Sequence, residues 1–225
     1  MIYHTPSWLS AGTTGKGDEL DETLTQSTCN PLALPRQTHS DHIAHVCHAC
    51  RPDDTDAVFT STPGLRLAVK TADCIPVLLY DHNKHTIAAI HAGWKGTVQH
   101  IVQKTIHAMG SHGNDLSAII GPGISMESFE VGDEVYERFL SEGFPMQRIA
   151  QRWQPTPQFP EGKWHIDLWE ANRWALEQCN VSDIFIAGVD TFTSPLYYSA
   201  RRETINTGRN YNWIEMNGER GAIND

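Results

Sequence analysis

The chain has 225 residues, 40% of them hydrophobic, and carries a formal net charge of −10 at pH 7. This length is sufficient for one domain with a sizeable core, and we expect a single domain spanning residues 1–225. The acidic balance argues against nucleic acid or an anionic membrane as the main partner, although a local cluster of cations can still bind a small anion.

Targeting signals and cysteine content both favour the cytoplasm. No apolar run approaches the roughly 18 residues of a membrane-spanning helix, and the N-terminus lacks the basic and then apolar pattern of a signal peptide. The five cysteines are an odd number, and a disulfide framework is not expected in a cytoplasmic protein of this size. We expect a cytoplasmic protein that is a monomer or a weak homo-oligomer.

Residues 12–18 (GTTGKGD) form a glycine-rich stretch around Lys16. Such a stretch binds phosphate through its backbone N–H groups when it connects a strand to a helix, and it is otherwise a flexible loop. It lacks the Gly-Lys-Ser/Thr ending of a P-loop, so the sequence leaves both interpretations open.

Residues 39–50 are rich in metal-binding side chains, with histidines at 39, 42, 45 and 48 and cysteines at 47 and 50. A structural zinc site requires four closed ligands, and no second Cys/His pair lies at a suitable distance. We therefore expect most of these histidines to be exposed or to cap other elements, and a local zinc site around Cys47 and Cys50 is the less favoured alternative.

The centre of the chain predicts a β-hairpin. Residues 70–81 have the β-branched and aliphatic body of a buried strand, residues 86–90 form a second apolar run, and the link between them is short and polar. Antiparallel pairing places Cys74, at the start of the first strand, near His91, after the end of the second. A thiol and an imidazole are thus predicted at one end of one hairpin.

The remaining elements follow from periodicity and turn residues. The predicted strands are residues 43–46, 56–60, 65–69, 116–120, 184–189 and 211–216, with a Pro-Gly turn at 61–64 joining the second and third. The predicted helices are residues 97–109, 129–140 and 168–178, the last with Asp167 as its N-cap, and residues 141–163 are predicted to be irregular. Strands outnumber helices and mostly form hairpins, so the predicted fold class is α+β.

His39, Cys74 and His91 together have the chemistry of a metal site. Two imidazoles and a thiolate suit Zn²⁺, and three protein ligands leave a fourth position for water or substrate, as in a catalytic site. Copper accepts the same ligands. Two alternatives use the same atoms: a nucleophilic thiolate activated by a histidine, or a buried cysteine beside two hydrogen-bonded histidines. The spacing along the chain does not decide between them.

Six motifs in order resemble the signature of one family. They are Gln37–Ser40, Thr71–Val77, His91–Gly96, Ile120–Ile124 with Phe129–Gly132, His165–Trp169, and Ser199–Arg202 with Thr207–Arg209. Together they look like the YfiH, or laccase-like polyphenol oxidase, family, whose members are described as purine nucleoside phosphorylases. The chain departs from the family pattern at Gly15, where an arginine is usual, and at residues 125, 126 and 128, where cysteines are frequent.

The resemblance implies a four-layer α/β/β/α sandwich with mixed sheets, related to the catalytic domain of cytotoxic necrotising factor. It implies a zinc site made by His39, Cys74 and His91, with copper as the possible alternative metal. The implied activities are phosphorolysis of adenosine, inosine and methylthioadenosine, and deamination of adenosine. The implied partners are therefore a purine nucleoside and phosphate.

Phosphorolysis requires a phosphate to be held beneath the ribose, and guanidinium groups match phosphate oxygens bidentately. Arg201 and Arg202 are the predicted phosphate ligands, with Lys16 or Lys95 as the next candidates. Asp73 is a candidate acid, or an anchor for a zinc-bound histidine. In a regular strand it points away from Cys74, so either role requires a bulge or a strand end at this position.

Two other functions remain as alternatives. A copper-dependent polyphenol oxidase is the older description of the family, but one site with two histidines and a cysteine is a poor match for four-electron reduction of oxygen. A role in quality control of peptidoglycan precursors belongs to a different class. Activity on adenosine with phosphate separates both from the phosphorylase.

Overall fold

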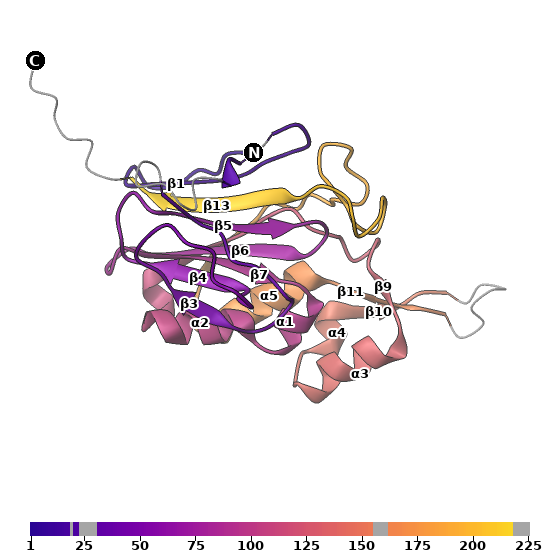
Figure 1. The fold of residues 1–225 in the computed structure, drawn as a ribbon. Coiled ribbons are helices and arrows are strands. Elements are labelled where there is room, and N and C mark those ends of the chain that lie inside the picture. The colour runs from indigo at the N-terminus through magenta and orange to yellow at the C-terminus, as the bar shows by residue number, and fades with distance from the viewer. Residues whose placement is uncertain (19, 23–30, 155–161, 218–225) are drawn as a thin grey trace, which may run out of the picture.

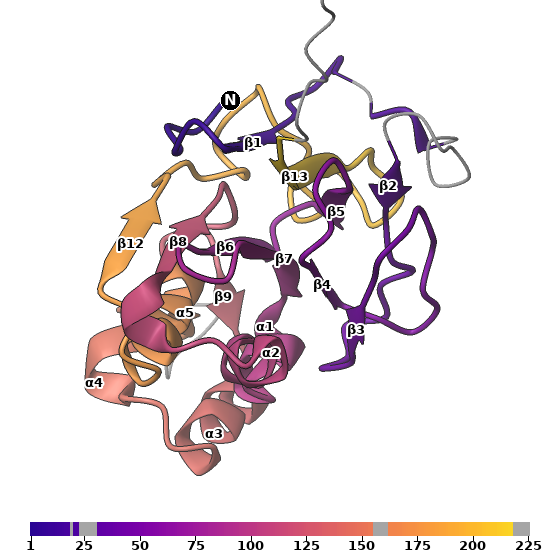
Figure 2. The same cartoon turned by 90° about the vertical axis from the view of Figure 1, so that its left-hand side faces the viewer.

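The fold is described by a computed structural model over residues 1–18, 20–22, 31–154 and 162–217. Two β-sheets pack against each other, and helices cover the outer face of the larger sheet (Figures 1 and 2). A third, small sheet lies beside the helices. The arrangement bears out the α+β class.

The larger sheet contains the central hairpin. Its strand order is β12-β8-β6-β7-β4-β3, with bounds Asp183–Ile186, Leu116–Ile120, Ile75–Asp81, Thr86–Ala92, Ala57–Thr60 and Ile43–His45. Strands β6 and β7 pair antiparallel, with Ile75 opposite Ala92 and Pro76 opposite His91. The predicted hairpin is therefore confirmed, and Cys74 directly precedes its paired end.

The remaining strands form two smaller sheets. Their orders are β1-β13-β5-β2 and β10-β11-β9. The bounds are Leu9–Thr13, Asn210–Met216, Arg66–Thr71 and Leu32–Ala33 for the first, and Ala150–Arg152, Trp164–Ile166 and Glu130–Val131 for the second. In the first of these sheets β13 is central, and it pairs antiparallel with both β1 and β5.

Two cores result from the alternation of side chains along the buried strands. In β6, Leu78 and Tyr80 pack between the two sheets, whereas Val77 and Leu79 pack under the helices. All seven residues of this strand are buried. Because both of its faces are covered, the strand has an almost continuous apolar sequence.

The helices cover one side of the larger sheet. They are α1 Trp94–Val98, α2 Ile101–Met109, α3 Asp133–Ser141, α4 Met146–Ile149 and α5 Leu168–Glu177, with a short 3₁₀ turn at Gly113–Asp115. Helix α5 begins as predicted, because the Asp167 carboxylate accepts a hydrogen bond from the Glu170 backbone N–H at 2.9 Å. The predicted helix at 97–109 is divided into α1 and α2 at His100, whose φ is 61°.

Two predicted strand connections are wrong. The turn at 61–64 does not close a hairpin, because β4 belongs to the larger sheet and β5 to the smaller one. The predicted strand at 70–81 is likewise the end of β5 and the whole of β6, and residues 72–74 carry the chain from one sheet to the other. Consecutive apolar runs indicate strands but not the sheet that each one joins.

Two smaller features also differ from prediction. The helix expected at 129–140 begins at Asp133, after the short strand β9. The connection at 141–163 contains α4 and β10, and its residues 155–161 lie outside the described part of the chain.

The layer count is the remaining expectation. The helices contact the six-stranded sheet, and no α-helix of the described residues covers the four-stranded sheet (Figure 2). The described part thus has one helical layer and two sheet layers. It also contains no helix that is both long and apolar enough to cross a membrane.

Candidate active site

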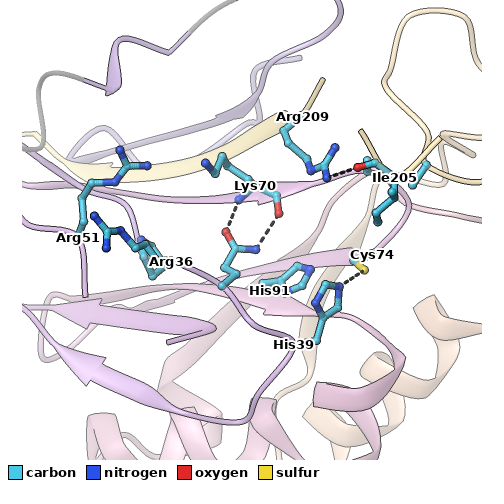
Figure 3. A pocket seen from close by; sticks show the side chains of 12 residues that line it. Arg36, His39, Arg51, Lys70, Cys74, His91, Ile205 and Arg209 are labelled. Carbon is cyan, nitrogen blue, oxygen red and sulfur yellow. Dashed lines mark hydrogen bonds between the residues drawn. The ribbon is translucent and has the colours of Figure 1, made fainter. Parts of the chain in front are cut away.

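His39, Cys74 and His91 lie together at one end of the sheets. One ligand atom from each residue lies within 4.8 Å of the others, and the Cys74 Sγ is 3.8 Å from the His39 Nε2. The donors of a tetrahedral zinc site, with bonds of about 2.0–2.3 Å, are separated by roughly 3.3–3.8 Å. The Cys74–His39 separation lies at the upper end of this range, and two imidazoles with a thiol are a donor set that suits a metal ion (Figure 3).

Each of the three residues comes from a different segment. Cys74 ends the crossing from β5 to β6, His91 lies near the end of β7, and His39 belongs to the loop between β2 and β3. His39 has a φ of 64° and Asp73 a φ of 85°, and this left-handed region is uncommon for residues other than glycine. Surrounding contacts must hold both residues there, as is frequent at functional sites.

Asp56 holds both histidines in place. This carboxylate is fully buried and accepts a hydrogen bond from the His91 Nδ1–H at 2.6 Å. It also accepts the backbone N–H groups of Thr38, His39 and Ser40 at 2.9–3.1 Å. Because Nδ1 of His91 is engaged, Nε2 is left to face the thiol, the usual arrangement for a metal-binding histidine.

Sequence reasoning missed Asp56. A signal for it was present, because an aspartate directly before a buried strand is seldom fully buried without a specific partner. Its histidine partner is distant in sequence, and the strand pairing that joins them involves β4 and β7.

Charge separation within the cluster favours a thiolate. Burial alone raises the pKa of the Cys74 thiol, but attraction to His91 and a hydrogen bond with His39 outweigh burial and lower it to about 6. Burial lowers the pKa of His91, and the Cys74 thiolate and Asp56 reverse this shift and raise it to about 9. Burial also opposes ionisation of Asp56, yet the hydrogen bond from His91 holds its pKa well below the ordinary range. A thiolate near neutral pH is the form that binds metal and also the form that acts as a nucleophile.

Gly93 has no side chain, and the space that a side chain would fill is taken by Cys74, His39 and His91. A Cβ at this position would lie 3.0 Å from the Cys74 Sγ, 3.2 Å from the His39 Cδ2 and 3.7 Å from the His91 Cε1. Its φ of −64° is accessible to any residue, so the glycine is required for close approach and not for backbone conformation.

Gln37 fixes the loop that carries His39. Its amide donates to the Lys70 carbonyl and accepts from the Lys70 N–H, both at 2.8 Å (Figure 3). The side chain thus pairs with the free edge of β5 as a neighbouring strand would. This contact explains why a glutamine stands two residues before the histidine.

A cavity of about 310 Å³ opens beside the three residues. Its described lining includes four cationic side chains, Arg36, Arg51, Lys70 and Arg209, and contains no Asp or Glu. A concave surface lined by one sign of charge concentrates ligands of the opposite sign. The cavity is therefore suited to an anion, although the chain as a whole carries a charge of −10.

Asp73 lies beside the site but faces away from the cavity. Its carboxylate accepts hydrogen bonds from the Thr191 hydroxyl and the Arg201 backbone N–H, each at 2.7 Å. The strand break expected for Asp73 is present, and the residue anchors the loop at 199–202, whereas Asp56 is the partner of His91. A role for Asp73 as an acid stays a prediction.

Arg201 and Arg202 have their guanidinium groups outside the described lining of the cavity. Arg202 donates to the carbonyls of Thr191, Phe192, Ser194 and Tyr197 at 2.5–2.8 Å. Arg201 donates to the carbonyls of Ser128 and Glu130 at 3.4 and 3.2 Å. The structure thus does not bring these arginines together with the metal-binding residues, and their phosphate role stays a prediction.

The two candidate lysines are also placed elsewhere. Lys16 forms an ion pair with Glu203, and its backbone N–H donates to the Leu196 carbonyl at 2.7 Å. Within the described residues, the glycine-rich stretch runs from strand β1 into a turn and is not followed by the α-helix that a phosphate loop needs. Lys95 lies over the ring of Trp94, away from the cavity lining.

The local zinc alternative around residues 45–50 is not supported. Among the described residues, His39, Cys74 and His91 are the one group of three or more side chains with metal-site spacing. Cys47, Cys50, Cys74 and Cys179 are free thiols, and Cys29 lies outside the described residues. The Cys47 Sγ lies 3.7 Å from the Nδ1 of His48.

Comparison with known proteins identifies the family. The model of the family described as "Multi-copper polyphenol oxidoreductase laccase" matches residues 18–217. The chain belongs to this family. A solved structure is similar over nearly the whole chain: the crystal structure of Bacillus licheniformis hypothetical protein YfiH superposes with a TM-score of 0.81 and 25% identity, covering 93% of this chain and 94% of that one.

Curated relatives of the chain carry enzyme names. A protein of Bacteroides thetaiotaomicron named purine nucleoside phosphorylase is 48% identical over 195 residues, which cover 79% of this chain and 70% of that protein. Adenosine deaminase RL5, from an unknown prokaryotic organism, is 36% identical over 199 residues, which cover 81% of this chain and 74% of that protein.

Proposed function

We propose that the protein is a zinc-dependent purine nucleoside phosphorylase that acts on adenosine, inosine and methylthioadenosine and also deaminates adenosine. The observation that carries the proposal is the cluster of His39, Cys74 and His91 on the wall of a cationic cavity. The names of the related proteins support both activities.

The reaction exchanges one bond at the sugar. A phosphate oxygen bonds to the anomeric carbon, the bond from that carbon to the purine nitrogen breaks, and its electron pair leaves with the base, which takes up a proton. The products from adenosine and inosine are ribose 1-phosphate and the free purine, and those from methylthioadenosine are methylthioribose 1-phosphate and adenine. In the deamination, water replaces the amino group of adenosine and ammonia leaves.

Within the chain, His39, Cys74 and His91 would hold the metal ion, and Asp56 would orient His91. When bound, Zn²⁺ supplies positive charge to an oxygen ligand in its open coordination position. The cationic wall of the cavity binds and orients the phosphate, while Ala200 and Ile205 give it an apolar side that suits a purine ring.

The metal role competes with a nucleophilic role for Cys74. A thiolate bound to a cation has its lone pairs engaged and is a poor nucleophile, so the two roles exclude each other. The metal is favoured because both histidines face the thiol, whereas a nucleophile needs one. A multicopper oxidase needs several copper sites, and the described residues provide one group of ligands.

Chromatography of the products tests the proposal. Purified protein should convert adenosine to adenine only with phosphate present, and should form inosine without it. Cys74→Ala should lose both activities and bound zinc, while retaining its fold by circular dichroism. A phosphate-independent protein that oxidises phenols would contradict the proposal, and full zinc content in Cys74→Ala would contradict the metal site.

A further inference from the structure

Arg209 differs from the other cations of the cavity in its partners. Arg51 and Lys70 share the carboxylate of Glu22, at 2.7 and 3.2 Å, and Arg36 pairs with Asp53 at 2.9 Å. No carboxylate of the described residues pairs with Arg209. Its positive charge is therefore the least compensated on the cavity wall.

Backbone carbonyls hold the Arg209 guanidinium in position. Nη1 donates to the carbonyls of Thr207 and Gly208, and Nη2 donates to the carbonyl of Ile205 at 2.7 Å. A guanidinium has five N–H groups, so two remain for a ligand. A cation fixed in advance loses little conformational entropy when it binds.

Arg209 faces the metal-binding residues across the cavity. Figure 3 shows its side chain on the wall opposite His39, Cys74 and His91, with Ile205 beside it. All five residues line the same cavity. A ligand in this space lies between the guanidinium and the three ligand residues.

We propose that Arg209 binds a phosphate group in this cavity, through two N–H groups that donate to two phosphate oxygens. A planar guanidinium matches this arrangement, and the neighbouring cations raise the local concentration of anions. The phosphate is either inorganic phosphate, the second substrate of the proposed reaction, or a phosphate ester carried by the nucleoside.

The proposal rests on the proposed function for the reaction it serves, but phosphate binding is measurable by itself. Equilibrium dialysis with radiolabelled inorganic phosphate should show binding to the wild-type protein. In Arg209→Gln, which keeps amide donors and loses the charge, the dissociation constant should rise about 10- to 100-fold, as expected for a lost charge-assisted hydrogen bond. Arg209→Lys should recover part of the affinity.

Steady-state kinetics extend the test to turnover. Arg209→Gln should raise the KM for phosphate in adenosine phosphorolysis by a similar factor, while phosphate-independent deamination of adenosine continues. Arg138→Gln is the matched control, because Arg138 is exposed on α3 and pairs with Glu142, so its KM for phosphate should equal that of wild type. Arg201→Gln tests the competing assignment in the same assay.

The outcomes separate the possibilities. Wild-type phosphate affinity in both Arg209→Gln and Arg209→Lys, for inorganic phosphate and for adenosine 5′-monophosphate, would overturn the proposal. Loss of affinity for the nucleotide alone would identify the ester as the ligand. Binding that depends on Arg209 without phosphorolysis would support Arg209 and contradict the proposed function. Thermal melts identify a misfolded variant, in which case Arg209→Lys decides.

Discussion

Replacing Asp56 by asparagine removes one charge beneath the metal cluster and preserves the size of the side chain. The Oδ1 atom accepts from the His91 Nδ1–H and the His39 N–H. The Oδ2 atom accepts from the Thr38 N–H and from both the N–H and the hydroxyl of Ser40. Whichever way the new amide is oriented, its NH₂ group faces a backbone N–H that cannot accept: that of His39 on one side, and those of Thr38 and Ser40 on the other.

The cost follows from these contacts. Each buried donor left without an acceptor costs about 1–3 kcal/mol, and breaking a buried charged pair costs about 3–5 kcal/mol. We expect Asp56→Asn to lower the free energy of unfolding by about 3–5 kcal/mol. Because His91 loses its orienting partner, zinc affinity should fall about 10- to 100-fold.

Two measurements check these values: urea denaturation monitored by tryptophan fluorescence, and competition for zinc against a chelator of known affinity. Asp54→Asn is the control, because Asp54 is an exposed acid in the same loop, and asparagine tolerates its φ of 45°. Its stability should change by less than about 0.5 kcal/mol. If Asp56→Asn binds zinc as tightly as Asp54→Asn does, Asp56 does not position the metal-binding residues.

Three further predictions concern single residues of the site and its surroundings. In metal-free protein, the rate of Cys74 alkylation by iodoacetamide should rise through pH 6 and not near pH 9, because the nearby imidazoles lower the pKa of the thiol to about 6. Added zinc should protect the thiol from alkylation. A midpoint of the rate profile near pH 9 would contradict the charge separation. Gly93→Ala should weaken zinc binding without loss of secondary structure, because the added Cβ would lie 3.0 Å from the Cys74 Sγ. Unchanged zinc affinity in a titration would show that the metal-binding side chains can move to make room for this Cβ. Arg202→Gln should lower the free energy of unfolding by at least about 2 kcal/mol, because four carbonyls lose their donor. This loss should exceed that of Arg201→Gln. Equal melting temperatures for the two variants would refute the structural role of Arg202.

The hairpin was predictable because its pattern is local. Two apolar runs with a short polar link determine the pairing of β6 with β7, and the register then brings His91 to Cys74. His39 was not predictable in this way, because its loop is positioned by the contact between the Gln37 amide and the Lys70 backbone. The family resemblance supplied His39 where residue patterns left other histidines open.

Sheet membership and arginine orientation depend on long-range contacts. Residues 72–74 (Ala-Asp-Cys) join two strand-like runs without a glycine or proline between them, so the sequence does not show that the chain leaves one sheet for another at that point. The arginines at 201, 202 and 209 are equally plausible phosphate ligands as residue types. Loop carbonyls engage all three guanidinium groups, but they hold the first two outside the cavity and Arg209 on its wall.

The most direct test of the central claim is a zinc titration of protein stripped by a chelator, with formation of ribose 1-phosphate from adenosine and phosphate as the readout. The metal-free protein should be inactive, and activity should recover in proportion to added zinc and reach its maximum at one ion per chain. Full phosphorolysis by demonstrably metal-free protein, abolished when Cys74 is alkylated, would contradict the account and assign the thiol as a nucleophile.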